Sequence, residues 1–232
     1  MGALRNEQNG RVRFHHLRSS SDEWLQKAES GSGQSFEAAR ASRALTDDYG
    51  RWSRWGLGLA AFVLFWVGST LVAVPVTIQS RAPFWVLPPS DVMFMVVGVL
   101  ACAWALSTLW RLHRSGRRLT RALGWWLRAP YRAGAARDLG GWIDARRVNF
   151  EPPMFARITT GTLAALLAIL TIAGTVREAQ QQDSILIGVL PLWGVLSLAC
   201  TIGQFGGVMR VASGAAEADP LWVRIRDAFR RH

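Results

Sequence analysis

The chain has 232 residues, half of them apolar, and carries a formal net charge of +11. Its apolar residues gather in four long blocks, a pattern that excludes a soluble amphipathic fold and indicates a polytopic membrane protein. The basic residues are 26 arginines and a single lysine. This strong preference for arginine is typical of a GC-rich genome, so we expect a bacterial source.

The segment before the first apolar block predicts two elements. Residues 1–34 are polar and basic, with runs of Ser and Gly, and predict a flexible cytoplasmic arm that holds at most one short helix. Residues 35–55 are rich in alanine and predict a cytoplasmic helix. This helix leads into Trp52 and Trp55, which are flanked by arginines in the pattern of an interfacial collar.

Four uncharged apolar blocks follow, and each is long enough to cross a bilayer. Their predicted bounds are 56–79, 91–110, 158–176 and 184–209. The connections within each pair of blocks are too short to recross a membrane of about 30 Å, so the blocks form two antiparallel hairpins. The sequence therefore predicts an all-α integral membrane protein with four transmembrane helices, over 56–209, and additional amphipathic helices on the cytoplasmic side.

A basic cytoplasmic segment, residues 111–157, connects the two predicted hairpins. Several of its arginines recur at intervals of three and four residues, so they share a helical face. The second transmembrane helix is expected to continue through this face until Pro130. The candidate basic cytoplasmic face consists of Arg111, Arg114, Arg117, Arg118, Arg121 and Arg128. Such a face suits anionic lipid headgroups, a vestibule that concentrates anions, or an acidic partner.

The C-terminal segment, residues 210–232, predicts one more amphipathic helix. Asp219 is placed to cap its first turn, and Pro220 suits the first helical position. Apolar side chains then follow on one face, among arginines, as in a helix that lies on a membrane surface.

The basic residues are distributed unequally between the two sides of the predicted membrane domain. The N-terminal region, the central segment and the tail carry 9, 11 and 5 Lys or Arg, whereas each short connection carries one. Cytoplasmic loops are enriched in Lys and Arg. The sequence therefore predicts a bacterial cytoplasmic (inner) membrane protein with both termini in the cytoplasm.

Apart from Asp91, which is expected to cap the start of the second block, the four predicted spans contain no Asp, Glu, Lys, Arg or His. Proton-coupled transporters and haem-binding bundles need such groups, so we expect a non-enzymatic protein with no catalytic residue, no metal and no cofactor. Only a cofactor held by apolar walls, such as a quinone or carotenoid, would suit these spans. Cys102 and Cys200 are both expected to be buried as apolar residues without a disulfide.

The last predicted span is the one that carries polar side chains and a repeat of small residues. Its candidate pore-lining or helix-packing residues are Pro191, where a kink is predicted, and Ala199, Thr201, Gly203, Gln204 and Gly207 beyond it. Three of them recur every four residues and form a ridge that is typical of helix packing. Alternatively, Thr201 and Gln204 would offer hydrogen bonds to ions or water in a pore.

These patterns support two functional hypotheses. The first is an oligomeric membrane channel or pore with a basic cytoplasmic mouth that favours anions. The second is an accessory or scaffold subunit whose arginine-rich face docks an acidic partner or the anionic headgroups of membrane lipids. Nucleic acid is the weakest candidate partner, because no known recognition motif is present. Both hypotheses predict assembly, either as a homo-oligomer or with another membrane protein.

Overall fold

The computed structural model describes residues 18–79, 88–137, 143, 151–180 and 185–229 of the chain. All regular structure in these ranges is helical. Four of the helices are long and apolar enough to cross a membrane. These observations confirm the prediction of an all-α chain with four such helices.

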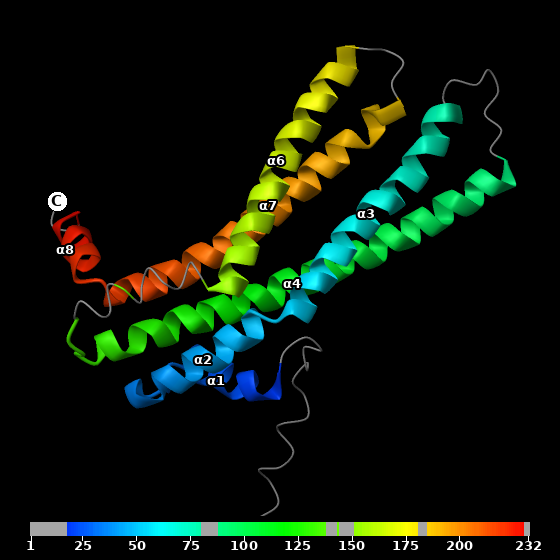
Figure 1. Ribbon diagram of the computed structural model, residues 1–232. Helices are drawn as coiled ribbons and strands as arrows, with labels where there is room; N and C mark the ends of the chain where they lie inside the picture. Colours follow the sequence, from blue (N-terminus) through cyan, green and yellow to red (C-terminus); the bar gives the residue numbers. More distant parts are fainter. Residues whose placement is uncertain (1–17, 80–87, 138–142, 144–150, 181–184, 230–232) are drawn as a thin grey trace, which may run out of the picture.

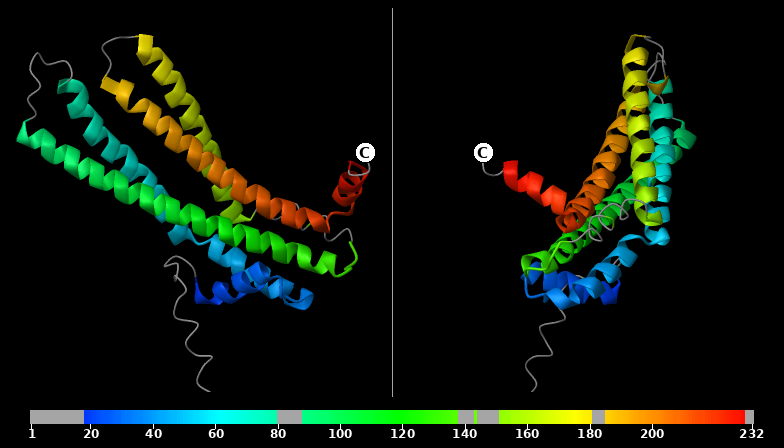
Figure 2. Two further views of the ribbon diagram at one scale, coloured as in Figure 1. Left: turned by 180° about the vertical axis from the view of Figure 1, so that it is seen from behind. Right: turned by 60° about the vertical axis from the view of Figure 1, so that its left-hand side comes forward.

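The helices α3 and α4 form one pair, and α6 and α7 form the other (Figure 1). In chain order the helices are α1 (Ser19–Ser30), α2 (Ala38–Tyr49), α3 (Trp52–Gln79), α4 (Pro89–Arg132), α6 (Pro152–Gln180), α7 (Leu190–Ala215) and α8 (Pro220–Phe229), with 3-10 turns at Ser35–Glu37, Ile185–Gly188 and Ala216–Ala218. The pairs diverge from a common base, where α4 packs against α7, and Figure 2 shows the same divergence from behind. We call this base the basic end of the molecule.

The two pairs also meet away from the basic end, through aromatic side chains. Trp66 of α3 stacks on Trp193 of α7, with the ring centroids 4.1 Å apart and the planes 8° from parallel. The indole N–H of Trp193 donates a hydrogen bond of 2.8 Å to the hydroxyl of Ser69. The pairs are therefore joined at two levels, and the space between these levels holds the candidate site described below.

The best-buried core lies at the basic end and not between the apolar segments. It is formed by residues from α1, α2, the second half of α4 and the adjoining ends of α6 and α7, namely Leu25, Ala28, Ala38, Ala41, Leu45, Tyr49, Leu119, Ala122, Leu123, Trp126, Ala129, Met154 and Val211. Most large side chains of the apolar segments are instead exposed on the outer surface. The basic end therefore has a core of its own, whereas the apolar segments expose most of their large side chains.

Helix α1 lies within residues 1–34, where the sequence predicts an arm that holds at most one short helix, and it packs against the rest of the described chain. Leu25 is only 2% exposed and packs in the core at the basic end. The Lys27 ammonium forms salt bridges with the carboxylates of Glu37, at 2.7 Å, and Glu23, at 3.0 Å. Hydrogen bonds to these two carboxylates raise the pKa of Lys27. Residues 1–17 of the predicted arm lie outside the described residues.

Helix α4 is continuous from Pro89 to Arg132, which confirms that the second apolar block extends into the basic segment. The prediction of a kink at Pro191 is wrong, because α7 begins at Leu190. Proline fits the first turn of a helix, where its missing N–H has no partner to lose. Helix α7 then runs to Ala215, beyond the predicted end of the fourth block at residue 209.

Asp219 caps α8 as the sequence predicts. Its Oδ1 atom accepts hydrogen bonds from the backbone N–H groups of Leu221, at 2.9 Å, and Trp222, at 3.3 Å. Pro220 occupies the first position of the helix. The exposed apolar side chains of α8 include Leu221, Trp222 and Phe229.

Replacement of Asp219 by alanine is expected to destabilise the first turn of α8 by about 1 kcal/mol, because two N–H groups lose their acceptor. Hydrogen exchange of the Leu221 and Trp222 amides should accelerate by about fivefold, which corresponds to that free energy. Asp219→Asn is the matched control, since asparagine caps helices equally well. Unchanged exchange in the alanine variant would show that the cap contributes nothing.

Candidate functional site

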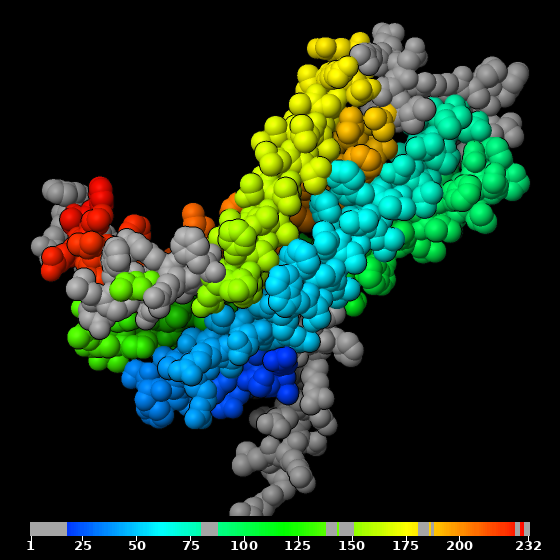
Figure 3. Space-filling model, in the orientation of Figure 1, coloured from blue at the N-terminus to red at the C-terminus, as the bar shows by residue number. Residues whose placement is uncertain are grey.

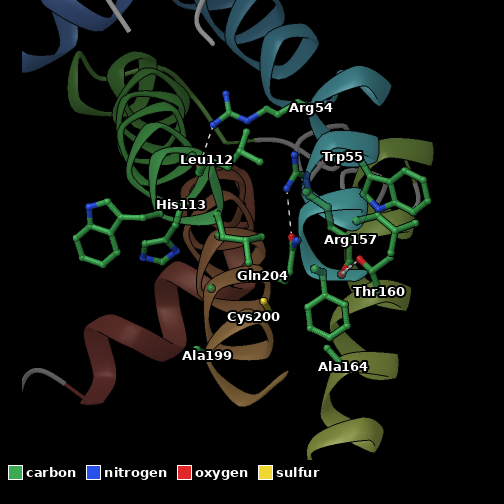
Figure 4. Close-up of a pocket in the computed structure, with 18 of the residues that line it drawn as sticks. Arg54, Trp55, Leu112, His113, Arg157, Thr160, Ala164, Ala199, Cys200 and Gln204 are labelled. Atoms are coloured by element: carbon green, nitrogen blue, oxygen red, sulfur yellow. Dashed lines mark hydrogen bonds between the residues drawn. The ribbon is translucent and has the colours of Figure 1, made fainter. Parts of the chain in front are cut away.

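A cavity of about 530 Å³ lies between the two helix pairs. Helices α3, α4, α6 and α7 all contribute to its wall, and Tyr49 at the end of α2 borders it at the basic end. Figure 3 shows α7 at the bottom of the depression between α3 and α6. Figure 4 shows the side chains at the basic end, where Arg54 and Arg157 point toward the cavity from different helices.

Arg54 is buried, although it immediately precedes the uncharged segment of α3, and is only 8% exposed. Its Nη2 atom donates hydrogen bonds to the carbonyl oxygen of Leu112, at 3.0 Å, and to the hydroxyl of Ser115, at 2.5 Å. Its Nη1 atom has no hydrogen-bond partner among the described residues. Burial, and then the charge of Arg157, lower the pKa of Arg54 to about 10, so the guanidinium remains charged at neutral pH.

Arg157, near the start of α6, is the second buried guanidinium and is 9% exposed. It lies over the ring of Tyr49, 3.8 Å from the ring centroid, in a cation–π contact. Its Nη2 atom donates to the carbonyl oxygen of Tyr49 at 2.7 Å, and its Nη1 atom donates to Oε1 of Gln204 at 3.2 Å. All of these partners are neutral, so they solvate the charge of Arg157 without balancing it.

The rim of the cavity adds further cationic side chains. Arg117 of α4 and Arg210 of α7 both line it, and each is close enough to influence the other electrostatically. None of the described residues that line the cavity is an aspartate or glutamate. The carboxylate of Asp48 interacts electrostatically with Arg54, but Asp48 does not line the cavity. Its Oδ1 atom forms a salt bridge with Nη1 of Arg51 at 3.5 Å. The cavity is therefore an electropositive site without an acidic side chain of its own.

The six arginines of the predicted basic face on α4 do not share one environment. Arg111, Arg114 and Arg121 are exposed to solvent. Arg118 instead contacts α1, where its Nη2 atom lies 2.8 Å from Oε1 of Glu29. Of the remaining two, Arg128 donates to the hydroxyl of Ser213 at 3.1 Å, and Arg117 lines the cavity. The structure thus brings only Arg117 of this set into the cavity.

Two of the three small residues in the predicted ridge of α7, Gly203 and Gly207, lie against other elements of the chain. A Cβ atom on Gly207 would lie 2.5 Å from the hydroxyl of Tyr49, and one on Gly203 would lie 3.1 Å from Nδ1 of His113. Ala199 lines the cavity, and Pro191 is exposed at the start of the helix. Gly203 and Gly207 therefore allow α7 to lie close to α4 and α2.

The two polar side chains predicted to line a pore also have partners inside the chain. The hydroxyl of Thr201 donates to the carbonyl oxygen of Ser197 at 2.9 Å and lies 3.4 Å from that of Gly161. Gln204 lines the cavity and accepts the hydrogen bond from Arg157. Of the two, only Gln204 belongs to the site.

No protein-family model, curated protein or solved structure matches this chain. The chemistry of the cavity is therefore inferred from its own side chains. Both cysteines are free but only partly buried, whereas the sequence predicts that both are buried, and Cys200 lines the cavity.

Neither Arg54 nor Arg157 is predicted from the sequence as a site residue. A signal was present in the helical register. Arg54 precedes Ala61 and Phe65 by seven and eleven residues, so the three share one helical face. Ala61 and Phe65 are buried between the helices, and Arg54 therefore faces inward with them.

Proposed function

We propose that the protein is a non-enzymatic membrane protein that binds an anionic ligand at the basic end of the cavity between its two helix pairs. The observation that supports this most directly is Nη1 of Arg54, a buried donor that has no partner in the described part of the chain and lies beside a second buried guanidinium. Burying a charge is costly unless it is paired. An anion between the two arginines would supply the missing counter-charge.

The proposal includes a placement in the bacterial cytoplasmic membrane, with the four apolar segments as two antiparallel transmembrane hairpins. The strong excess of Lys and Arg on one side supports cytoplasmic termini and a cytoplasmic basic end. In this placement the core of α1, α2 and the second half of α4 is a cytoplasmic domain. The ligand then binds at the cytoplasmic surface of the membrane.

The anion-favouring oligomeric channel is a second candidate function. The cationic mouth formed by Arg54, Arg157, Arg117 and Arg210 supports it, because such a mouth concentrates anions. The wall beyond the mouth is mainly apolar, however, and apolar constrictions in pores expel water. The geometry of the single chain therefore favours binding over conduction.

Inorganic phosphate, compared with chloride at constant ionic strength, is expected to raise the Tm of the purified protein in a non-ionic detergent. For a chain of this size each kcal/mol of binding free energy raises Tm by about 2–4 °C. Arg54→Met should abolish this increase. The variant should still fold, because the hydroxyl of Ser115 keeps its hydrogen bond of 2.8 Å to the carbonyl oxygen of Arg111.

The matched control is Arg40→Met, which removes one exposed arginine from α2 and should leave the phosphate effect unchanged. A wild-type protein that responds equally to phosphate and chloride would contradict the proposed anion site, and so would an equal response in Arg54→Met. Phosphate or chloride flux through liposomes that is lost in Gln204→Leu would favour the channel instead.

A further inference from the structure

The anion site occupies only one end of the cavity. Beyond the arginines the wall is apolar and includes Phe62, Leu106, Leu109, Leu163, Leu167 and Leu196 from all four long helices. A small inorganic anion would contact the charged end and leave this wall unoccupied. Burial of apolar surface contributes about 25 cal/mol per Å², so a ligand with an apolar part gains affinity from the same cavity.

The position of the cavity is that expected for a ligand drawn from the membrane. Trp55 and Trp110 line the cavity, and Trp55 lies beside the charged end; tryptophan is enriched at the level of lipid headgroups. Among the described helices, α3 and α6 do not pack along one another, and Figure 3 shows the depression between them. The cavity thus opens sideways, toward the surface where acyl chains would lie, and its arginines are at headgroup depth.

The size and charge of the cavity indicate which class of lipid it would bind. Its volume of about 530 Å³ has room for roughly 18 groups the size of a water molecule, at about 30 Å³ each, which accommodates a phosphate group and much of one acyl chain. A phosphomonoester carries between one and two negative charges at neutral pH and has three acceptor oxygens. The negative charge of a phosphomonoester would balance the guanidinium groups of Arg54 and Arg157, and one of its oxygens could accept a hydrogen bond from Nη1 of Arg54.

Building on the anion site proposed above, we infer that the ligand is a single-chain lipid with a phosphomonoester headgroup. Its phosphate lies between Arg54 and Arg157, and its acyl chain follows the apolar wall toward Leu167 and Leu196. The lipid moves into the cavity from the cytoplasmic leaflet, between α3 and α6.

Cys200 allows this inference to be tested in the intact protein, because its thiol lies on the cavity wall one helical turn from Gln204. The protein is reconstituted in phosphatidylcholine nanodiscs and treated with a small thiol reagent, and labelling is followed by peptide mass spectrometry. Cys102 is an internal reference, since its thiol lies in the α3–α4 contact, 3.7 Å from the carbonyl oxygen of Phe65, and outside the cavity lining.

Lysophosphatidate with one oleoyl chain is the probe. At ten times its Kd it should slow labelling of Cys200 by about tenfold and leave Cys102 unchanged. Inorganic phosphate should give little protection, because it does not reach the apolar wall, and neutral monooleoylglycerol should give little because it lacks the charge. Arg54→Met should lose the protection by lysophosphatidate, whereas Arg40→Met should keep it.

The possible outcomes separate the lipid inference from the anion site. If phosphate raises Tm but lysophosphatidate does not protect Cys200, the anion site stands and the lipid inference is wrong. If neither ligand has an effect, both are wrong. Equal protection by lysophosphatidate and monooleoylglycerol would mean that the arginines do not recognise the headgroup, which also overturns the inference.

Discussion

Replacement of Trp126 by alanine is expected to lower the free energy of unfolding at the basic end by about 3–5 kcal/mol, the usual loss for a fully buried tryptophan. The Trp126 side chain is completely buried, and its indole N–H donates a hydrogen bond of 3.0 Å to the carbonyl oxygen of Trp24 in α1. Its ring also meets that of Trp24 edge to face, with the centroids 5.7 Å apart. Its loss should therefore release α1 from α4.

Limited proteolysis within α1, at Lys27, measures this effect directly, because a bond inside a packed helix is cleaved only after the helix is released. Trp104→Ala is the matched control, since Trp104 lies on the same helix but is half exposed on the outer surface of an apolar segment. The control should be cleaved at the wild-type rate. Equal protection of wild type and Trp126→Ala would show that Trp126 does not hold α1 in place.

Replacement of Gly98 by leucine is expected to force α3 and α4 apart and to cost at least about 3 kcal/mol, the upper part of the range for overpacking. The two helices meet with Gly98 opposite Gly68. A Cβ atom on Gly98 would lie 2.6 Å from the carbonyl oxygen of Gly68. A backbone oxygen cannot rotate away as a side chain can, so the helices themselves must move.

Thermal unfolding in detergent should show a loss in Tm of about 6–12 °C for this variant, at 2–4 °C for each kcal/mol. Gly56→Leu is the control on α3, because a Cβ atom there has no neighbour within 4 Å. It should be neutral or slightly stabilising, since leucine favours helix more than glycine does. If both variants unfolded at the wild-type temperature, the close approach of α3 and α4 would not contribute to stability.

The apolar helices could be predicted because their cause is local. Long uncharged blocks are sufficient to identify them, and the arginine spacing also predicted that α4 extends beyond its apolar segment. The order of α1 depends instead on contacts far apart in the sequence, such as the hydrogen bond between Trp126 and Trp24. A composition of Ser, Gly and charged residues does not reveal such contacts, so the segment was predicted to be flexible.

The candidate site could be predicted only in part, for a similar reason. The sequence identified Gln204 and the basic character of this end of the molecule. It did not distinguish an arginine that faces inward, such as Arg157, from one that faces solvent, such as Arg111. That difference arises when two helix pairs are placed side by side. The contact between Arg157 and Gln204, 47 residues apart, exists only in the folded chain.

The unbroken course of α4 has a mechanical consequence. With 44 residues at about 1.5 Å each, the helix is a rod of roughly 66 Å. The helix contacts α3 through Gly98 near one end and packs against α1 and α2 near the other end. A tilt of about 5° about the glycine contact displaces the far end of such a rod by several ångströms. Any ligand that changes the angle between the helix pairs therefore produces a larger displacement at the surface formed by α1 and α2.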